Sequence, residues 1–239
     1  MSKIINILQL YPKEMNIYGD YGNALVLIRR LQWYGYEPNL LTYNPGDEFP
    51  KDIDIIIGGG GQDSGQIKIH EDLMSISTKL KKLADDGTPM LVICGLYQLF
   101  GKFFKTVNDE TMDGIGILDI ETYGKTERLI GNVISKSEDF GVIVGYENHS
   151  GQTFLSGKTK PLATVVRGAG NNMKDGHEGA TYKNVIGSYL HGSLLPKNPA
   201  IADFLIAKAI ERKYSEKLEK TIDDSLTEKA RKSALKRPR

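Results

Sequence analysis

The sequence contains a single cysteine, Cys94, among its 239 residues. One thiol excludes an internal disulfide, so the chain does not belong to the small secreted proteins that disulfides hold together. The opening residues also lack the charged and apolar layout of a secretory signal. These two absences predict a cytoplasmic protein.

The sequence also lacks an excess of charge of either sign, and it lacks long apolar runs. The 31 Lys and Arg residues nearly balance the 30 Asp and Glu residues, which leaves a net charge of +1. Such a balance gives no overall field that would attract nucleic acid. No apolar stretch reaches the roughly 18 residues that a membrane-spanning helix needs. We therefore expect neither a nucleic-acid partner nor a transmembrane segment.

The first half of the chain alternates buried-looking strands with amphipathic helices. Apolar runs at residues 4–10, 40–43, 53–57 and 90–94 are typical of parallel strands, which are covered on both faces. Apolar side chains recur at helical spacing over residues 27–34 and 69–83. This order predicts an α/β protein built on a three-layer, doubly wound, mostly parallel sheet.

From residue 113 onward the pattern changes to short strand-like runs separated by turn residues. It predicts an antiparallel extension of the same sheet, then a last strand over residues 185–190 and a helix that begins at Asn198 and Pro199. We expect one domain over residues 1–213. Residues 214–239 are almost wholly polar and predict a partly disordered C-terminal tail.

Cys94 stands between the apolar run Met90–Ile93 and a segment with helical character. A residue at such a turn lies at the carboxyl edge of the sheet, and the N-terminus of the following helix favours a thiolate. A thiolate there would attack the carbonyl of an amide or an ester. The alternative is that Cys94 is a small buried hydrophobic residue, as many single cysteines are.

Four consecutive glycines, Gly58–Gly61, follow the third predicted strand. Without side chains, their backbone N–H groups are able to approach a ligand closely. An oxyanion hole is one use of this arrangement. A phosphate cradle has less support, because no Lys-Ser or Lys-Thr pair of the P-loop type follows. A plain surface turn is the third interpretation.

His191 follows the last predicted strand, so its imidazole should emerge at the same sheet edge as Cys94. In a Cys–His pair the imidazole takes the thiol proton and later gives it to the leaving amine. His149 is the alternative base, since spacing along the chain does not prove that two side chains meet. The histidines and the cysteine are too dispersed for zinc, and we expect no metal and no cofactor.

Five blocks of the sequence resemble the class I (triad) glutamine amidotransferases, in the branch that includes the glutaminase domains of cobyrinic and cobyric acid synthases. They occur in that family's order, and the resemblance covers about residues 4–212. The resemblance implies the fold of that class and glutamine hydrolysis. The blocks are Gly58–Gly61, Cys94–Gln98, Asp113–Leu118, Tyr146–Gly151 and Gly187–Gly192.

The same resemblance assigns roles to individual residues. Cys94 would be the nucleophile and His191 the general base. The backbone N–H of Gly95 and one from the Gly59 and Gly60 region would form the oxyanion hole.

The resemblance also implies the residues that bind L-glutamine. Gln98 falls on the glutamine of the family's nucleophile block. Arg128 would bind the α-carboxylate of the substrate, a group that a guanidinium grips through two hydrogen bonds. The alternative for Arg128 is a solvated strand residue.

Two positions depart from the family pattern. Many triad amidotransferases have a glutamate two residues after the histidine, where this chain has Ser193. The site is therefore a dyad, or its orienting acid comes from elsewhere, with Asp20 and Glu147 as candidates. Leu96 also replaces the usual second glycine after the nucleophile. Both departures fit a subunit that a partner activates.

The resemblance also implies a partner chain, because this sequence shows no segment that would bind ATP. The fold begins by residue 4 and no P-loop is present, so an ATP-dependent synthetase would be a separate chain. Within the branch, the segments Leu8–Pro12 and Met15–Asn23 resemble glutaminase subunits that form a heterodimer with a MurT-like ligase. By this resemblance the ligase amidates the D-glutamate of lipid II, a step in peptidoglycan synthesis. The alternatives are a glutaminase for a cobalamin or pyridoxal phosphate precursor, and a non-catalytic α/β binding module.

Overall fold

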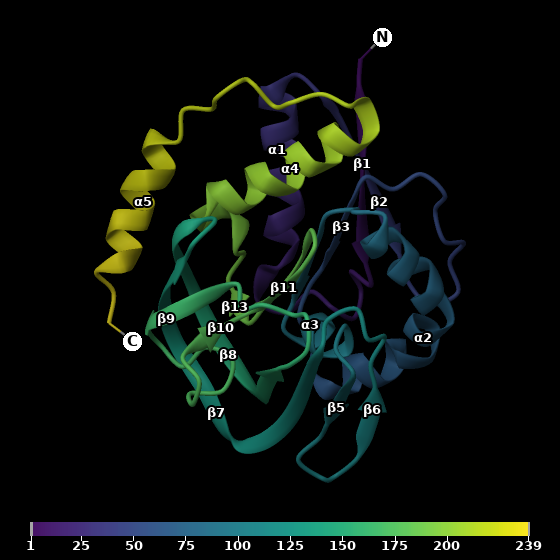
Figure 1. Ribbon diagram of the computed structural model, residues 1–239, viewed down its shortest axis with the longest axis vertical. Helices are drawn as coiled ribbons and strands as arrows, with labels where there is room; N and C mark the ends of the chain where they lie inside the picture. The colour runs from purple at the N-terminus through teal and green to yellow at the C-terminus, as the bar shows by residue number, and fades with distance from the viewer. Residues whose placement is uncertain (1, 239) are drawn as a thin grey trace.

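The computed structural model describes residues 2–238, and its central element is a six-stranded sheet (Figure 1). The strand order is β11-β12-β4-β3-β1-β2, and all neighbours are parallel except β11 and β12. This arrangement confirms the α/β class. The strands are β1 (Ile4–Leu10), β2 (Glu37–Tyr43), β3 (Ile55–Gly58), β4 (Met90–Ile93), β11 (Ala180–Tyr182) and β12 (Val185–Ser188).

Helices cover both faces of this sheet. From β1 the chain crosses through α1 (Tyr21–Tyr34) to β2 on one side, and from β3 it crosses through α2 (Asp63–Asp85) to β4 on the other side. Two right-handed crossovers in opposite directions place α1 and α2 on opposite faces. The helix α4 (Pro199–Tyr214) packs beside α1 (Figure 1). The carboxyl ends of β1, β3 and β4 therefore open at one edge between these layers, where ligands bind in such sheets.

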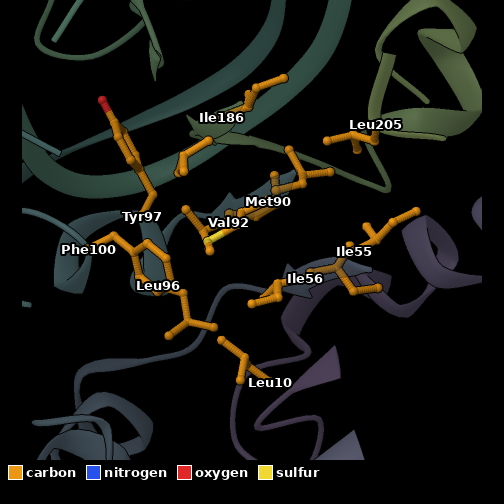
Figure 2. Close-up of a cluster of buried hydrophobic side chains, with 14 of the residues drawn as sticks. Leu10, Ile55, Ile56, Met90, Val92, Leu96, Tyr97, Phe100, Ile186 and Leu205 are labelled. Carbon is orange, nitrogen blue, oxygen red and sulfur yellow. The ribbon is translucent and has the colours of Figure 1, made fainter. Parts of the chain in front are cut away.

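The part of the core that positions the site lies between β3, β4 and the short helix α3 (Gly95–Leu99). Figure 2 shows Leu96, Tyr97 and Phe100 from this region packed around the strand residues Ile56 and Val92. All four residues of β3 and all four of β4 are buried, as a strand covered on both faces requires. This rigid packing fixes the point where Cys94 leaves β4.

The antiparallel strands form a second sheet and do not extend the first one. The long hairpin of β7 and β8 is its centre, joined by β9, β5 and short edge strands. The predicted single sheet was therefore wrong in this respect. Its strands are β5 (Phe103–Lys105), β6 (Thr111–Asp113), β7 (Ile120–Ser137), β8 (Gly141–Leu155), β9 (Ala163–Arg167), β10 (His177–Glu178) and β13 (Leu190–His191).

The last predicted strand is divided between the two sheets. β12 ends at Ser188 in the first sheet, and β13 pairs with β8 in the second sheet. Glu178 holds the crossing point, because its carboxylate accepts hydrogen bonds from the Ser188 hydroxyl at 2.7 Å and the Tyr189 N–H at 3.2 Å. The Ser188 hydroxyl in turn accepts the Leu190 N–H at 3.0 Å. The sequence did not reveal this break, because residues 185–190 are uniformly apolar or small.

The C-terminal segment crosses the outside of the fold and contains the helix α5 (Ser225–Leu235) (Figure 1). Arg30 on α1 binds Asp224 in the segment and Asp203 on α4, with its side chain only 4% exposed. At the far end, Arg167 donates to the carbonyls of Leu235 and Arg237 at 3.0 and 2.8 Å. Two turns of 3₁₀ helix complete the described chain, η1 (Ile17–Gly19) and η2 (Leu195–Lys197). Among the helices of residues 2–238, none is long and apolar enough to cross a membrane.

Candidate active site

Cys94 stands at a sharp turn between β4 and α3. Its backbone has φ 49° and ψ −102°, a strained positive-φ conformation that costs a non-glycine residue about 1 kcal/mol or more. The turn is held by the Cys94 N–H, which donates to the Ser188 carbonyl, and by the Cys94 carbonyl, which accepts from the Gln98 N–H, both at 2.9 Å. The side chain is 7% exposed and lines a cavity of about 380 Å³. The cysteine is therefore raised out of the sheet and reaches a pocket.

The imidazole of His191 lies beside Cys94, with Gly60 between them. A Cβ atom at Gly60 would come within 2.5 Å of His191 Cε1 and 3.0 Å of Cys94 Cβ. The distance between His191 Cε1 and Cys94 Cβ is therefore no greater than the sum of these two distances. The structure brings together the two residues that the sequence placed on the same sheet edge. The glycine is required here because any side chain would fill the space between nucleophile and base.

Asp20 is the acid that lies next to His191. Its Oδ2 is 3.3 Å from His191 Nδ1, and both side chains are almost fully buried. Of the two candidates from the sequence, Glu147 is directed elsewhere, since its two oxygens accept the N–H groups of Ala169 and Gly170 at 2.8 Å. The arrangement is a Cys–His–Asp series in which the acid comes from the loop after β1.

The environment of His191 favours its charged form. Burial lowers its pKa, but the neighbouring Cys94 and Asp20 outweigh burial and raise the pKa to about 10. An imidazolium at neutral pH stabilises a thiolate beside it and holds the proton that a leaving amine needs.

His149, the alternative base, is not equipped for that role. It is 2% exposed, stacks on the Tyr189 ring at 3.6 Å, and hydrogen-bonds through Nδ1 with the Gly151 carbonyl at 2.7 Å. Burial lowers its pKa to about 3. We therefore assign the Cys94 partner to His191 and treat His149 as a neutral residue of the pocket wall.

The glycine loop differs in detail from the predicted oxyanion hole. The Gly60 N–H donates to Asp20 Oδ2 at 2.7 Å and is thus already engaged. Gly59 serves close packing, because a Cβ there would lie 2.4 Å from the Met15 carbonyl oxygen. The next glycine, Gly61, lines the cavity, and its amide nitrogen lies 3.1 Å from the Cβ position of Gly95. Gly95 is therefore the backbone neighbour of Gly61, although of the predicted glycines Gly59, Gly60 and Gly95 none lines the cavity itself.

The other two predicted substrate residues also lie at the cavity. Gln98 lines it but is 4% exposed, and its side-chain amide accepts from Gln66 at 2.9 Å and donates to the Tyr189 hydroxyl at 3.1 Å. Gln98 is thus fixed by the protein and forms part of the wall. Arg128 is exposed on β7 and donates from Nε to Asn148 Oδ1 at 2.6 Å. Its guanidinium stands at the mouth with donors to offer a carboxylate.

Sequence reasoning missed two side chains of this cavity. Tyr18, on η1, places its ring edge-on to His191 with centroids 5.0 Å apart. Asn148, on β8, joins Tyr18 to Arg128 through its side-chain amide. Both residues fall within blocks that resemble the family, which was the available signal, but their contacts join segments 130 residues apart. Among residues 2–238, no group of three or more His, Cys, Asp or Glu side chains is placed to hold a metal ion.

With this geometry in place, the family is clear. Residues 6–199 match the model of the CobB/CobQ-like glutamine amidotransferase domain. The chain therefore belongs to this family, which confirms the resemblance seen in the five sequence blocks.

Individual relatives narrow the comparison. The chain is 41% identical over 210 residues to the GatD subunit of lipid II isoglutaminyl synthase (glutamine-hydrolyzing) from Staphylococcus aureus strain N315, covering 87% of this chain and 86% of the relative. The GatD subunit from Streptococcus pneumoniae R6 is 37% identical over 218 residues, covering 90% and 84%. A probable cobyric acid synthase from Methanothermobacter thermautotrophicus is 34% identical over 155 residues, but these span only 30% of its length.

Solved structures agree on the fold. A crystal structure of a glutamine amidotransferase superposes with a TM-score of 0.57 at 16% identity, covering 84% of this chain and 98% of that one. The structure of PurLQS from Thermotoga maritima gives 0.56 at 16% identity, covering 86% and 98%. At this level of identity the comparison shows the architecture alone, and that architecture is the class I amidotransferase fold expected from the sequence.

Proposed function

We propose that this chain is the glutaminase subunit of a two-chain amidating enzyme in the cytoplasm. It hydrolyses L-glutamine and supplies ammonia to a MurT-like, ATP-dependent ligase subunit, which amidates the D-glutamate of lipid II during peptidoglycan synthesis. The observation that carries glutamine hydrolysis is the Cys94–His191–Asp20 arrangement beside a cavity that Cys94 and Gly61 line. The two GatD relatives, similar over most of both chains, favour lipid II as the final acceptor.

The first half-reaction forms a thioester. The Cys94 thiolate attacks the side-chain amide carbon of glutamine, and the carbonyl oxygen takes up negative charge next to the backbone N–H groups of Gly95 and Gly61. The His191 imidazolium gives its proton to the departing nitrogen, and ammonia leaves as the carbonyl re-forms. The products of this step are free ammonia and a γ-glutamyl thioester.

The second half-reaction restores the enzyme. Neutral His191 removes a proton from water, the resulting hydroxide attacks the thioester carbonyl, and the carbon–sulfur bond breaks. Glutamate is released, and the thiolate–imidazolium pair is regenerated. Asp20 stabilises the imidazolium through both half-reactions, since its carboxylate lies 3.3 Å from Nδ1.

The substrate would be recognised by residues at the mouth of the cavity. Arg128 is the exposed cation there and would receive the α-carboxylate of glutamine, as two parallel hydrogen bonds suit the guanidinium. Replacement by lysine keeps the charge but removes the planar pair of donors. We expect Arg128→Lys to raise KM for glutamine about tenfold while kcat changes less.

The decisive test separates the two nitrogen sources. In a complex reconstituted with a MurT-like ligase, Cys94→Ala should abolish lipid II amidation with glutamine but preserve it with an ammonium salt. A glutamine-mimicking electrophile such as 6-diazo-5-oxo-L-norleucine should label Cys94 in the natural chain. Persistent glutamine-dependent activity in Cys94→Ala would contradict the thioester mechanism. Ammonia release without amidation of lipid II would instead leave the hydrolysis intact and point to another acceptor.

A further inference from the structure

Tyr18 contacts both the proposed general base, His191, and Asn148, which binds the proposed substrate-binding residue Arg128. Its ring meets the imidazole of His191 edge-on, with an interplanar angle of 74°. Its hydroxyl accepts a hydrogen bond from Asn148 Nδ2 at 2.8 Å. One side chain thus touches the general base and, on its other side, reaches strand β8.

Asn148 continues this connection to Arg128. Its Oδ1 accepts from Arg128 Nε at 2.6 Å, and its backbone carbonyl lies 3.5 Å from Arg128 Nη2. The side-chain amide of Asn148 is a single planar group, so its oxygen and nitrogen move together. A change in the position of the guanidinium therefore shifts the hydrogen bond that Tyr18 accepts.

The backbone around Tyr18 is anchored on both sides. The Ile17 N–H donates to the Gly60 carbonyl at 3.0 Å, and the Ser193 hydroxyl donates to the Gly19 carbonyl at 2.7 Å. Tyr18 itself has φ 58°, a left-handed conformation, and is 43% exposed. The edge-on contact with His191 and the hydrogen bond from Asn148 hold this exposed side chain over the site. Its position is therefore set by the two groups that it links.

We infer that Tyr18 is a positioning residue that couples the carboxylate-binding Arg128 to the general base His191. The inference rests on the proposed function, because it takes Arg128 as the site of the substrate α-carboxylate. When that carboxylate fixes the guanidinium, Asn148 holds the Tyr18 ring over the imidazole. The ring then covers the edge of His191 and keeps the base aligned with Cys94. Recognition of a glutamine carboxylate at the mouth is thereby transmitted to the reacting atoms.

The test measures glutamine binding without requiring turnover. Iodoacetamide modifies the Cys94 thiol of the purified full chain, L-glutamine protects it, and mass spectrometry follows the modification. Tyr18→Phe keeps the ring and removes the hydroxyl. We expect the glutamine concentration that gives half-maximal protection to rise about three- to tenfold, because one hydrogen bond is lost. The labelling rate without glutamine should stay as in the natural chain, because the ring still covers His191.

Two further variants separate the coupling from a loss of structure. Tyr18→Ala also removes the ring and should lower the labelling rate in the absence of glutamine, because the imidazole is no longer held against the thiol and less thiolate forms. In a chain that already carries Arg128→Ala, adding Tyr18→Phe should weaken protection no further, since the hydrogen-bond chain is already broken. Tyr21→Phe is the matched control, a tyrosine of the same segment that is 39% exposed and lies outside the cavity lining.

The outcomes distinguish this inference from the function on which it rests. If Tyr18→Phe needs the same glutamine concentration as the natural chain, Tyr18 does not couple the two groups, and the inference fails alone. If the penalties of Tyr18→Phe and Arg128→Ala add in full, the connection through Asn148 is likewise excluded. If glutamine does not protect Cys94 in the natural chain, glutamine binding itself is refuted, and the inference fails together with the proposed function.

Discussion

Asp20 contacts His191 and the glycine loop with the same carboxylate oxygen. Oδ2 lies 3.3 Å from His191 Nδ1 and accepts the Gly60 N–H at 2.7 Å. Because Asp20 is 3% exposed, water does not compete strongly for this oxygen. The residue thus sets the orientation of the imidazole relative to the loop that separates it from Cys94. In the proposed mechanism it takes the place of the glutamate that many triad amidotransferases have two residues after the histidine.

Asp20→Asn should strongly reduce glutamine hydrolysis. The amide has nearly the same shape but lacks the negative charge of Asp20, which together with Cys94 raises the pKa of His191. Loss of this partner lowers the pKa of the imidazolium and weakens the orientation of the ring. By analogy with the acid of the Ser-His-Asp triad, kcat should fall about 10²- to 10⁴-fold. Steady-state ammonia release across pH is the measurement, and the fall on the alkaline side should begin at a lower pH.

The control for this variant is Asp109→Asn, on an exposed turn that carries a single ion pair with Lys105. Its activity and pH profile should match those of the natural chain. If Asp20→Asn retains full kcat with an unchanged profile, the site is a Cys–His dyad and Asp20 is only a loop residue.

Gly60→Ala should inactivate the site while the chain stays folded. The added methyl group would lie 2.5 Å from His191 Cε1, so the imidazole must move away from Cys94. We expect kcat to fall at least about 10²-fold, as displacements near 1 Å do in other active sites. Circular dichroism and the melting temperature check the fold. Gly141→Ala is the comparison, because it strains a positive φ of 68° in open space yet should retain activity. Equal activity in both variants would contradict the arrangement described here.

Local patterns predicted the parts of this molecule that depend on nearby residues. The buried strands Ile4–Leu10 and Met90–Ile93 lie where their apolar runs indicate, because each is covered on both faces. The approach of His191 to Cys94 followed only in part: β12 is parallel to β4 and ends at the same edge, but His191 itself lies three residues further on, on β13 of the second sheet. Chain order and residue type were sufficient for these strands and for their common edge.

Features that depend on distant contacts were not predictable in the same way. Whether Asp20 forms a turn or faces His191 is decided by the packing of the loop after β1 against the glycine loop. The second sheet arises where Glu178 fixes the crossing from β12 to β13, which leaves no trace in the pattern of residues 185–190. The use of the Gly60 N–H is a further case, because four successive glycines look alike in sequence.

Glu178→Gln should change how stability depends on pH. Burial raises the pKa of this carboxyl to about 7, although the Ser188 hydroxyl bond works against the rise. The folded chain therefore holds the proton more tightly than the unfolded chain, where the pKa is the ordinary 4.5. This contribution to stability is complete below pH 4.5 and is lost as pH rises through about 7. A glutamine side chain at position 178 does not ionise, so it does not lose stability as pH rises.

We expect Glu178→Gln to gain about 1 to 3 kcal/mol relative to the natural chain between about pH 5 and about pH 8. Urea unfolding at several pH values gives both free energies of unfolding. Glu110→Gln, at an exposed position beside β6, should run parallel to the natural chain at every pH. A Glu178→Gln difference that does not vary with pH would show that this carboxyl is ionised in the folded protein throughout.

Asp224→Asn should loosen the C-terminal segment without disturbing the active site. Asp224 accepts from two nitrogens of Arg30 at 2.7 and 3.0 Å, while Asp203 continues to pair the buried guanidinium from α4. Because Arg30 keeps one carboxylate, the loss in unfolding free energy should be only about 1 to 2 kcal/mol. Trypsin should cut sooner at lysines of the released segment such as Lys217 and Lys220. The neighbouring Asp223→Asn keeps an acceptor for the Ser225 N–H and should digest as the natural chain does. Equal digestion of both variants would mean that the Arg30 pair does not hold the segment, and that contacts such as Arg167 with the Leu235 carbonyl do so instead.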